Sequence, residues 1–206
     1  MVGRAIERHD PTHLIVTFDP PPPTFRHKMY PDYKANRPSA PEGLLEGCER
    51  VRERLEELDV VFCTVEGYEA DDVLGTLSSR ASVSGFQTMI LTSDLDLLQL
   101  VSPITEVEVF SQYWAKRSFD VEAAKRRFGG LAPENIPDYK ALAGDTSDNL
   151  PGVPGIGAVA ATAVLGEYGN LDKVYEDLEA ISKLPIRGAR RVSRLLAEHR
   201  EQAFLM

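Results

Sequence analysis

Four short runs of apolar, mostly β-branched residues constrain the fold of this chain more than any other feature. The runs cover residues 14–18, 60–65, 88–91 and 107–110, and only the last contains a charged residue, Glu108. Continuous apolar runs of this length are typical of strands buried on both faces of a parallel sheet. Residues 42–58 and 73–80 instead repeat apolar side chains at intervals of three and four, which predicts amphipathic helices. This alternation predicts an α/β fold with a parallel sheet and flanking helices.

Acidic residues follow three of the predicted strands. They are Asp19 after the first strand, Glu69, Asp71 and Asp72 after the second, and Asp94 and Asp96 after the third. In open α/β sheets, ligands bind at the carboxyl ends of the strands, which lie along one edge. Acids at the start of a helix also cap it and interact favourably with its dipole, so capping alone would explain some of them. Three acids in four residues exceed what capping requires.

Residues 138–157, DYKALAGDTSDNLPGVPGIG, combine two further features. Asp145 and Asp148 are spaced three apart, which on a helical turn places both carboxylates toward one hard cation. The glycine-rich turn Gly152–Gly157 leads into a predicted apolar helix over residues 159–165. Glycines that open a helix present backbone N–H groups to an anion such as a phosphate. An enzyme acting on a phosphodiester backbone would need both sites.

Eight carboxylates in one cleft would repel each other strongly without counter-ions. A ligand set of oxygens, without cysteine or histidine, indicates magnesium or manganese rather than zinc. Two such ions about 4 Å apart are a known arrangement for phosphodiester hydrolysis. The four acidic motifs together therefore predict a two-metal phosphodiesterase site.

The net charge of −9 is unusual for a nucleic-acid-binding protein, which is normally basic. Without the eight motif acids the net charge would be −1. An acidic solvated surface is the alternative interpretation. Cys48 and Cys63 have no metal-ligand spacing and are expected to be reduced, mostly buried thiols. The sequence shows no membrane span and no secretory signal, so we expect a cytoplasmic protein.

Residues 20–41 contain seven prolines and have no helical or strand periodicity. A structureless run of this length in a compact domain is often functional. Its basic and aromatic side chains are interspersed: Phe25, Arg26, His27, Lys28, Tyr30, Tyr33, Lys34 and Arg37. Such a mixture suits a single-stranded nucleic acid, through charge on the phosphates and stacking on the bases. The alternative is a proline-rich surface loop with incidental charges. Further helices are predicted over residues 1–9, 120–128, 133–143, 171–178 and 189–197.

These motifs resemble those of the 5′-nuclease family, which includes the 5′→3′ exonuclease domain of bacterial DNA polymerase I and the flap endonucleases. The resemblance rests on the Phe18-Asp19 strand end, on FRHKMYPDYKANR, GYEADD and TSDLDLLQL, and on residues 138–157. It implies an α/β nuclease core over residues 1–137, with an arch at about residues 20–41. It also implies a helix–three-turn–helix subdomain over residues 138–206 that binds duplex DNA.

The resemblance also implies roles for individual residues. Two Mg²⁺ or Mn²⁺ ions would be bound, the first by Asp19, Glu69, Asp71 and Asp72 and the second by Asp94, Asp96, Asp145 and Asp148. Arg26, Lys34 and Arg37 would act at the scissile region or on the 5′ strand, with Lys34 as the candidate stabiliser of charge at the scissile phosphate. DNA would be bound by Tyr33, Gly152, Val153, Gly155, Ile156 and Gly157, with a potassium ion at the carbonyls of the turn as a further candidate.

The chain departs from the family pattern at three places. It lacks the family's first strand, which ends in an Asp-Gly pair whose aspartate is a metal ligand. After the glycine turn, Ala158-Val159-Ala160 is apolar where the family usually has a base. Duplex binding would then be weaker, or would rest on Lys173, Arg187, Arg190 and Arg191. Leu95 stands between Asp94 and Asp96, where a lysine is common.

The expected function is that of a monomeric, divalent-metal-dependent 5′→3′ exonuclease and 5′-flap endonuclease of DNA replication and repair. Its partner would be DNA with a 5′ flap, a nick or a 5′ end, and the products would carry a 3′-hydroxyl and a 5′-phosphate. Two alternatives stay open. One is a catalytically impaired, structure-specific DNA-binding remnant of the same family, and the other is a related metallonuclease that acts on RNA.

Overall fold

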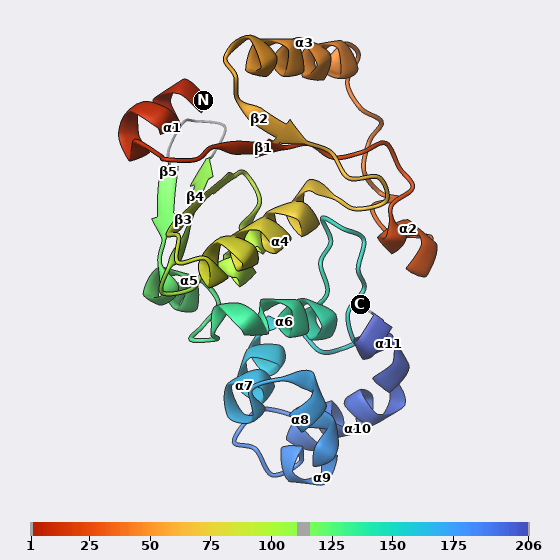
Figure 1. Cartoon of the computed structure of the whole chain (residues 1–206). Helices are drawn as coiled ribbons and strands as arrows, with labels where there is room; N and C mark the ends of the chain where they lie inside the picture. Colours follow the sequence, from red (N-terminus) through yellow and green to blue (C-terminus); the bar gives the residue numbers. More distant parts are fainter. Residues whose placement is uncertain (1, 111–115, 206) are drawn as a thin grey trace. The chain divides into compact units, whose positions relative to one another are not determined.

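The computed structural model of the chain describes residues 2–110 and 116–205 (Figure 1). The chain divides into two compact units. The first unit comprises Met1–Phe25 and Pro38–Leu74, and the second comprises Arg26–Arg37 and Gly75–Met206. Each unit has its own sheet, and each is described separately below.

The first unit is built on a parallel pair of strands. Strand β1 (Ile15–Thr17) pairs with β2 (Val61–Cys63), with Ile15 opposite Val61. The parallel pairing confirms the prediction, although both strands are shorter than the apolar runs that predicted them. Helix α1 (Val2–His9) precedes β1, and α3 (Leu44–Glu57) precedes β2. The guanidinium of Arg52 lies 4.8 Å from the ring centroid of Phe18, so α3 packs a charged side chain across an aromatic ring.

Two helices extend across the division between the units. Helix α4 (Ala70–Val83) begins earlier than predicted, because carboxylates bind the N–H groups at its start. Helix α2 (Phe25–Met29) lies inside the segment that was expected to be structureless. Residues 31–36 continue as hydrogen-bonded turns. The expectation of a loop without secondary structure over residues 20–41 was therefore wrong.

The second unit contains a three-stranded sheet. Strand β3 (Thr88–Thr92) runs parallel to β4 (Thr105–Phe110), and β5 (Lys116–Phe119) pairs antiparallel to β4. The α/β class and the parallel pairing were predicted. The described ladders nevertheless form two sheets, whereas the sequence suggested one. Strand β5 was not predicted, because its sequence KRSF has no apolar run.

Helices make up the rest of the second unit. They are the 3-10 helices η1 (Leu95–Leu100) and η2 (Pro133–Asn135), and the α-helices α5 (Val121–Arg127), α6 (Ile136–Ala143), α7 (Ala158–Tyr168), α8 (Leu171–Glu176), α9 (Leu178–Ile181), α10 (Ala189–Glu198) and α11 (Arg200–Leu205). The predicted helix over residues 171–178 is divided at Asp177, whose carboxylate accepts from the N–H of Ala180 and caps α9. The predicted cap of α5 is confirmed, since Asp120 accepts from the N–H of Ala123 at 2.7 Å.

Helices α6 to α11 share one hydrophobic core, and α7 to α11 form the blue part of Figure 1. Buried members of this core include Leu142, Val153, Val164, Ile181 and Leu196. Helix α10 buries Val192 and Leu196 and exposes its arginines, which explains its amphipathic sequence. This core fixes the glycine turn between α6 and α7. Among the described residues, no helix is long and apolar enough to cross a membrane.

Candidate metal and nucleic-acid sites

The first acidic group surrounds the N-terminus of α4 within the first unit. The carboxylate of Asp19 accepts a hydrogen bond from the N–H of Ala70 at 2.7 Å. That of Asp72 accepts from the N–H of Glu69 at 2.9 Å. Asp71 lies in the same helical turn. The carboxylates of Asp19 and Asp72 are thus held by backbone N–H groups at the positive end of a helix, where negative charge is stabilised.

The second acidic group lines a cavity of about 510 Å³ within the second unit. Three of its carboxylates, those of Asp94, Asp96 and Asp145, belong to the lining. Asp94 caps η1 by accepting from the N–H of Asp96 at 2.8 Å, as the sequence suggested for one acid of this pair. The ammonium of Lys140, on α6, forms ion pairs with both Asp96 and Asp145. A single positive charge therefore lies between two carboxylates in this cavity.

The two carboxylates that share this ammonium differ in their proton affinities. Burial raises the pKa of Asp96 to about 6, against the attraction of Lys140, and repulsion from Asp94 and Asp145 adds to the increase. Burial also acts on Asp145, but its hydrogen bonds from Lys140 and Ser147 outweigh that effect and lower its pKa. Burial disfavours the charged form of Lys140, but its hydrogen bonds and attraction to Asp145 and Asp96 outweigh that effect and raise its pKa.

Asp148 lies within a closed loop that begins at Asp145 and ends at Leu150, and not on a helical turn with Asp145. Backbone hydrogen bonds join the N–H of each of Asp145 and Leu150 to the carbonyl of the other, both at 2.8 Å. The carboxylate of Asp148 instead forms an ion pair with the guanidinium of Arg37 at 2.6 Å and accepts a hydrogen bond from the hydroxyl of Tyr33 at 3.1 Å. The helical geometry assumed from the spacing was wrong, because Gly144 turns the chain away at the end of α6.

Residues 30–37 lie against this loop. The backbone N–H of Lys34 donates to the carbonyl of Asp148 at 3.0 Å, and Asn36 donates to the carbonyl of Thr146 at 2.7 Å. From the loop, the side-chain amide of Asn149 donates to the carbonyl of Asp32 at 2.7 Å. The ring of Tyr33, a predicted stacking residue, is only 5% exposed. Predicted nucleic-acid-binding residues and a predicted metal ligand are thus joined in one hydrogen-bonded structure.

Of the other residues in the predicted segment, Lys34 has its ammonium 4.7 Å from the ring centroid of Tyr33. It adopts a left-handed backbone conformation with a φ of 56°. Arg26 lies in α2, and its carbonyl accepts from the N–H of Tyr30 at 2.8 Å. Arg37 is bound to Asp148 and to the carbonyl of Ser147.

The glycine turn packs tightly against the end of α6. Gly152 has a φ of +63°, and a Cβ built on it would lie 2.3 Å from the backbone nitrogen of Gly144. The N–H of Val153 donates to the carbonyl of Leu142 at 2.9 Å, and Gln202 from α11 donates to the carbonyl of Gly152 at 2.6 Å. The side chains of Val153 and Ile156 are buried. Their predicted contribution to binding is therefore restricted to their backbone groups.

Beyond the buried residues, the turn is open to solvent. Gly155 and Gly157 are exposed, and the turn leads into α7 as the sequence predicted, with Gly157 as its N-cap and Ala158 as its first residue. A Cβ on Gly157 would meet nothing within 4 Å. The first N–H groups of a helix have no partner within the helix. The start of α7 therefore has the local structure of an anion site.

The residues of the second acidic group fit a divalent cation in their chemistry. Their donors are all carboxylate oxygens, and the Lys140 ammonium shows that the space between Asp96 and Asp145 accepts a cation. Over residues 2–110 and 116–205, however, no three His, Cys, Asp or Glu residues are grouped closely enough to form a ready-made metal site. An ion at Asp96 and Asp145 would take the place of the Lys140 ammonium.

Four residues that organise these sites were not predicted from the sequence. Lys140 and Arg127 line the cavity, Asn36 binds the loop after Asp145, and Gln202 binds the glycine turn. Lys140 could have been found, since it lies within the segment 138–157 whose acids were singled out. Arg127 and Gln202 lie on helices whose sequences give no functional signal.

Comparison with known proteins places this chain in a family. Residues 1–129 match the 5′-3′ exonuclease, N-terminal resolvase-like domain, and residues 131–206 match the 5′-3′ exonuclease, C-terminal SAM fold. The chain belongs to the 5′-3′ exonuclease family, as the sequence motifs indicated.

Among curated proteins, the chain is homologous to bacterial DNA polymerase I over nearly its whole length. It is 40% identical over 202 residues to that of Chloroflexus aurantiacus, which covers 97% of this chain and 21% of the relative. It is 36% identical over 206 residues to that of Bacillus caldotenax, which covers 100% of this chain and 23% of the relative. The chain thus spans about a fifth of the length of these relatives.

Solved structures support the fold. T5 5′-exonuclease with bound divalent metal ions (zinc) has a TM-score of 0.74 at 23% identity, over 99% of this chain and 76% of that chain. The catalytic core of Rad2 in complex with DNA substrate has a TM-score of 0.55 at 18% identity, over 89% of this chain and 56% of that chain. At these identities the likeness concerns the fold alone.

Proposed function

We propose that this chain is a divalent-metal-dependent 5′→3′ exonuclease and 5′-flap endonuclease that hydrolyses DNA phosphodiesters in replication and repair. The observation that carries this proposal is the cavity in which Asp94, Asp96 and Asp145 lie beside the ammonium of Lys140. Membership of the 5′-3′ exonuclease family and the metal-bound and DNA-bound structures of similar fold support it.

The acids would hold two Mg²⁺ or Mn²⁺ ions, one in each group. The ligands of the first ion would be Asp19, Glu69, Asp71 and Asp72, and those of the second Asp94, Asp96, Asp145 and Asp148. When bound, such ions supply an activated water and stabilise the negative charge that develops on the phosphate. Before binding, Lys140 limits the repulsion between Asp96 and Asp145 and keeps both carboxylates in place.

The basic residues of the 26–37 segment would bind the substrate's phosphates. Arg37 holds Asp148 at 2.6 Å, and a phosphate would compete with this carboxylate for the same guanidinium. Binding DNA would then release Asp148 for a cation. Lys34 is positioned beside this loop by its backbone bond to Asp148, and Lys34 and Arg26 would add positive charge at the scissile region.

The C-terminal part, over residues 138–206, would bind the duplex through the glycine turn, with residues 1–137 as the nuclease core. Exposed N–H groups at the start of α7 suit a DNA phosphate. Carbonyls of the turn would bind K⁺, although that of Gly152 already accepts from Gln202. The active form would be a monomer acting on DNA with a 5′ flap, a nick or a 5′ end.

The experiment is cleavage of a 5′-labelled DNA flap with Mg²⁺, Mn²⁺ or EDTA, alongside single-stranded DNA, intact duplex and an RNA flap. We expect metal-dependent short products from the DNA flap. Asp145→Asn should reduce cleavage by at least ~100-fold, because metal ions contribute several kcal/mol to such reactions. Asp138→Asn is the matched control, since Asp138 lies outside the cavity and binds the N–H of Leu171 at 2.9 Å. Equal cleavage by the Asp145→Asn variant would refute the proposal.

A second candidate is a catalytically impaired DNA-binding remnant of the same family. It is favoured by the first unit, whose described sheet has only the two strands β1 and β2. It is also favoured by the ion pair that engages the carboxylate of Asp148 with Arg37. A shift of the flap DNA on a gel without any products, in Mg²⁺ and in Mn²⁺, would select this candidate.

A further inference from the structure

Three consecutive carbonyl groups in the middle of the 145–150 loop accept hydrogen bonds from the 30–37 segment. The pairs are the backbone N–H of Lys34 with the carbonyl of Asp148 at 3.0 Å, the side chain of Asn36 with that of Thr146 at 2.7 Å, and Nε of Arg37 with that of Ser147 at 3.1 Å. The loop's own backbone closes at its two ends, where Asp145 and Leu150 bind each other. Because ordered backbone groups need partners, the loop takes partners for its middle carbonyls from the segment.

One hydrogen bond runs in the opposite direction. The side-chain amide of Asn149, in the loop, donates to the carbonyl of Asp32, in the segment, at 2.7 Å. Asn36 and Asn149 therefore form a reciprocal pair, since the amide of each binds a backbone carbonyl on the other side. We call these two asparagines, together with the carbonyls of Thr146 and Asp32, the clasp.

Each side of the clasp contains a residue in the left-handed backbone conformation. The φ angle is 56° at Lys34 and 58° at Asn149. Asparagine tolerates this conformation, but for a lysine it is unfavourable and persists only where the surrounding structure imposes it. Asn36 follows Lys34 by two residues. The clasp therefore anchors the backbone that sets the direction of the Lys34 side chain.

The clasp differs in kind from the charged contacts beside it. The carboxylate of Asp148 is bound by Arg37 and Tyr33, and the side chain of Asp148 is 14% exposed. A phosphate would compete for the guanidinium, and a cation would compete for the carboxylate. The amides of Asn36 and Asn149 are neutral and bind backbone carbonyls. They can therefore hold the two backbones together while the charged groups change partners.

We propose that Asn36 and Asn149 are positioning residues for the reaction. The clasp holds Lys34 and Asp148 in a fixed relation, also while Arg37 exchanges the carboxylate for a phosphate. Its consequence for cleavage rests on the proposed function, which it deepens by naming what keeps the basic segment and the acidic loop together. Neither asparagine would touch the substrate. The segment and the loop should then open and close as one unit.

Hydrogen exchange of the metal-free protein, followed by NMR in EDTA, tests the clasp without cleavage. Asn36→Ala should speed the exchange of the Leu150 amide about fivefold, the factor expected for the loss of one hydrogen bond. Asn149→Gly removes the side chain and keeps a residue that adopts a positive φ freely, so it should speed the exchange of the Arg37 amide by a similar factor. Each of these amides binds a carbonyl on its own side, so only coupling across the contact should change its exchange.

Steady-state cleavage of a 5′-labelled DNA flap with Mg²⁺ tests the positioning, with the folded fraction checked by circular dichroism. Both Asn36→Ala and Asn149→Gly should lower kcat roughly 10–100-fold, the range found for outer residues that orient metal ligands. The KM for the flap should change by less than about threefold, because neither asparagine contributes to ground-state binding of the DNA.

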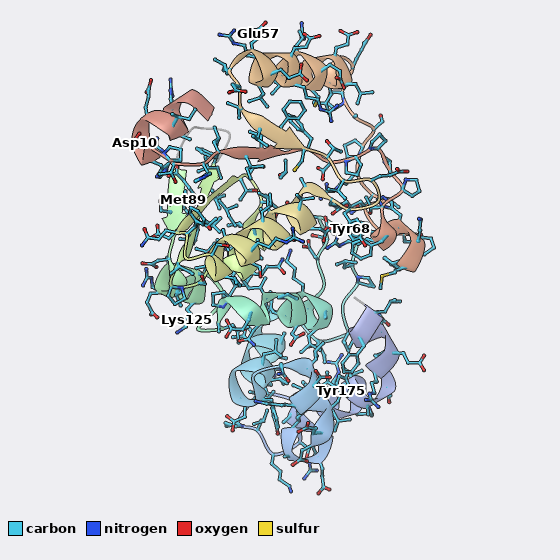
Figure 2. The ribbon with its side chains drawn as sticks, in the orientation of Figure 1. Asp10, Glu57, Tyr68, Met89, Lys125 and Tyr175 are labelled. Atoms are coloured by element: carbon cyan, nitrogen blue, oxygen red, sulfur yellow. The ribbon has the colours of Figure 1, made fainter. Side chains whose placement is uncertain are left out.

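Asn170→Ala is the matched control, since it also removes one hydrogen bond between a side chain and the backbone, from the N–H of Lys173 at 3.0 Å. Asn170 caps α8, the helix whose Tyr175 is labelled in Figure 2. The kcat of this variant, and its exchange at Leu150 and Arg37, should equal those of the wild type.

Wild-type exchange at Leu150 in Asn36→Ala, or at Arg37 in Asn149→Gly, would refute the clasp. Faster exchange combined with a wild-type kcat would refute the positioning role, and so would an equal loss of kcat in Asn170→Ala. Failure of the wild type to cleave the flap would overturn the proposed function, and the exchange of the metal-free protein separates that failure from a failure of the clasp.

Discussion

The contact between Gly152 and the end of α6 gives the sharpest quantitative prediction. Gly152 is buried and has a φ of +63°. A Cβ there would lie 2.3 Å from the nitrogen of Gly144 and 2.7 Å from both the carbonyl carbon of Ala143 and the Cα of Gly144. All three atoms belong to the backbone, so no side chain can rotate to make room. Gly152→Ala must therefore displace α6 or the turn.

Two costs contribute to the effect of Gly152→Ala. The left-handed conformation costs an alanine roughly 1–2 kcal/mol. Crowding of a packed interior costs roughly 1–3 kcal/mol more. The free energy of unfolding should thus fall by roughly 2–5 kcal/mol, which for a chain of this size lowers the melting temperature by roughly 4–20 °C.

Two other glycines of the same turn are internal controls. Gly157 has a φ of −107° and nothing within 4 Å of an added Cβ, so Gly157→Ala should stay within about 0.5 kcal/mol of the wild type. Gly155→Ala should fall between the two, because its Cβ meets the flexible side chain of Arg191. The assay is urea denaturation followed by circular dichroism. A Gly152→Ala variant as stable as Gly157→Ala would refute the reasoning.

Three further changes test other parts of the structure. Lys140→Met should cost roughly 1–3 kcal/mol, because it leaves Asp96 and Asp145 facing each other without a cation. Because the pKa of Lys140 is raised in the folded state, the charged lysine stabilises the fold fully below the unfolded pKa near 10.5, and this stabilisation is lost as the pH rises through the folded pKa. Urea titrations should therefore show the difference in unfolding free energy between the wild type and Lys140→Met at pH 8, and this difference should disappear in stronger alkali. Asp138→Asn should leave the free energy of unfolding unchanged or raise it at pH 7, because burial raises the pKa of Asp138 and so disfavours its ionised form in the fold. Any gain in stability over the wild type should disappear as the pH falls below that pKa. A large loss of stability at pH 7 would contradict this reasoning. Tyr33→Phe removes the hydroxyl bond to Asp148 and should cost about 1 kcal/mol locally, seen as faster hydrogen exchange of the Lys34 amide, with unchanged exchange as the contrary result.

The sequence predicted those parts of the fold that depend on local pattern. Apolar runs located the strands β1 to β4, and apolar periodicity located α3 and α10. Asp120 was recognised as the cap of α5 because capping involves residues three apart. The glycine turn was predicted to lead into α7, because glycines that open a helix leave its first N–H groups exposed. Strand β5 was missed, because its polar sequence KRSF forms a strand only through pairing with β4.

The candidate site, like the fold, was predictable only in part from the sequence. The sequence identified its acids, because residue type and position after a strand are properties of the chain itself. It did not show that Asp145 and Asp148 bind different bases, Lys140 and Arg37, since that depends on how Gly144 ends α6. The spacing of Asp145 and Asp148 predicted a helical turn, which the chain does not form at this place.

The sequence by itself therefore determined the family and the α/β class, and it supplied the candidate site residues. Only the tertiary structure decided which of these residues form ion pairs and which of them contact each other. Gln202 reaches the carbonyl of Gly152, and Arg191 reaches Gly155, because α10 and α11 pack on the core that also holds the turn. Contacts between residues so far apart in the chain follow from the packing of whole helices, which no local pattern encodes.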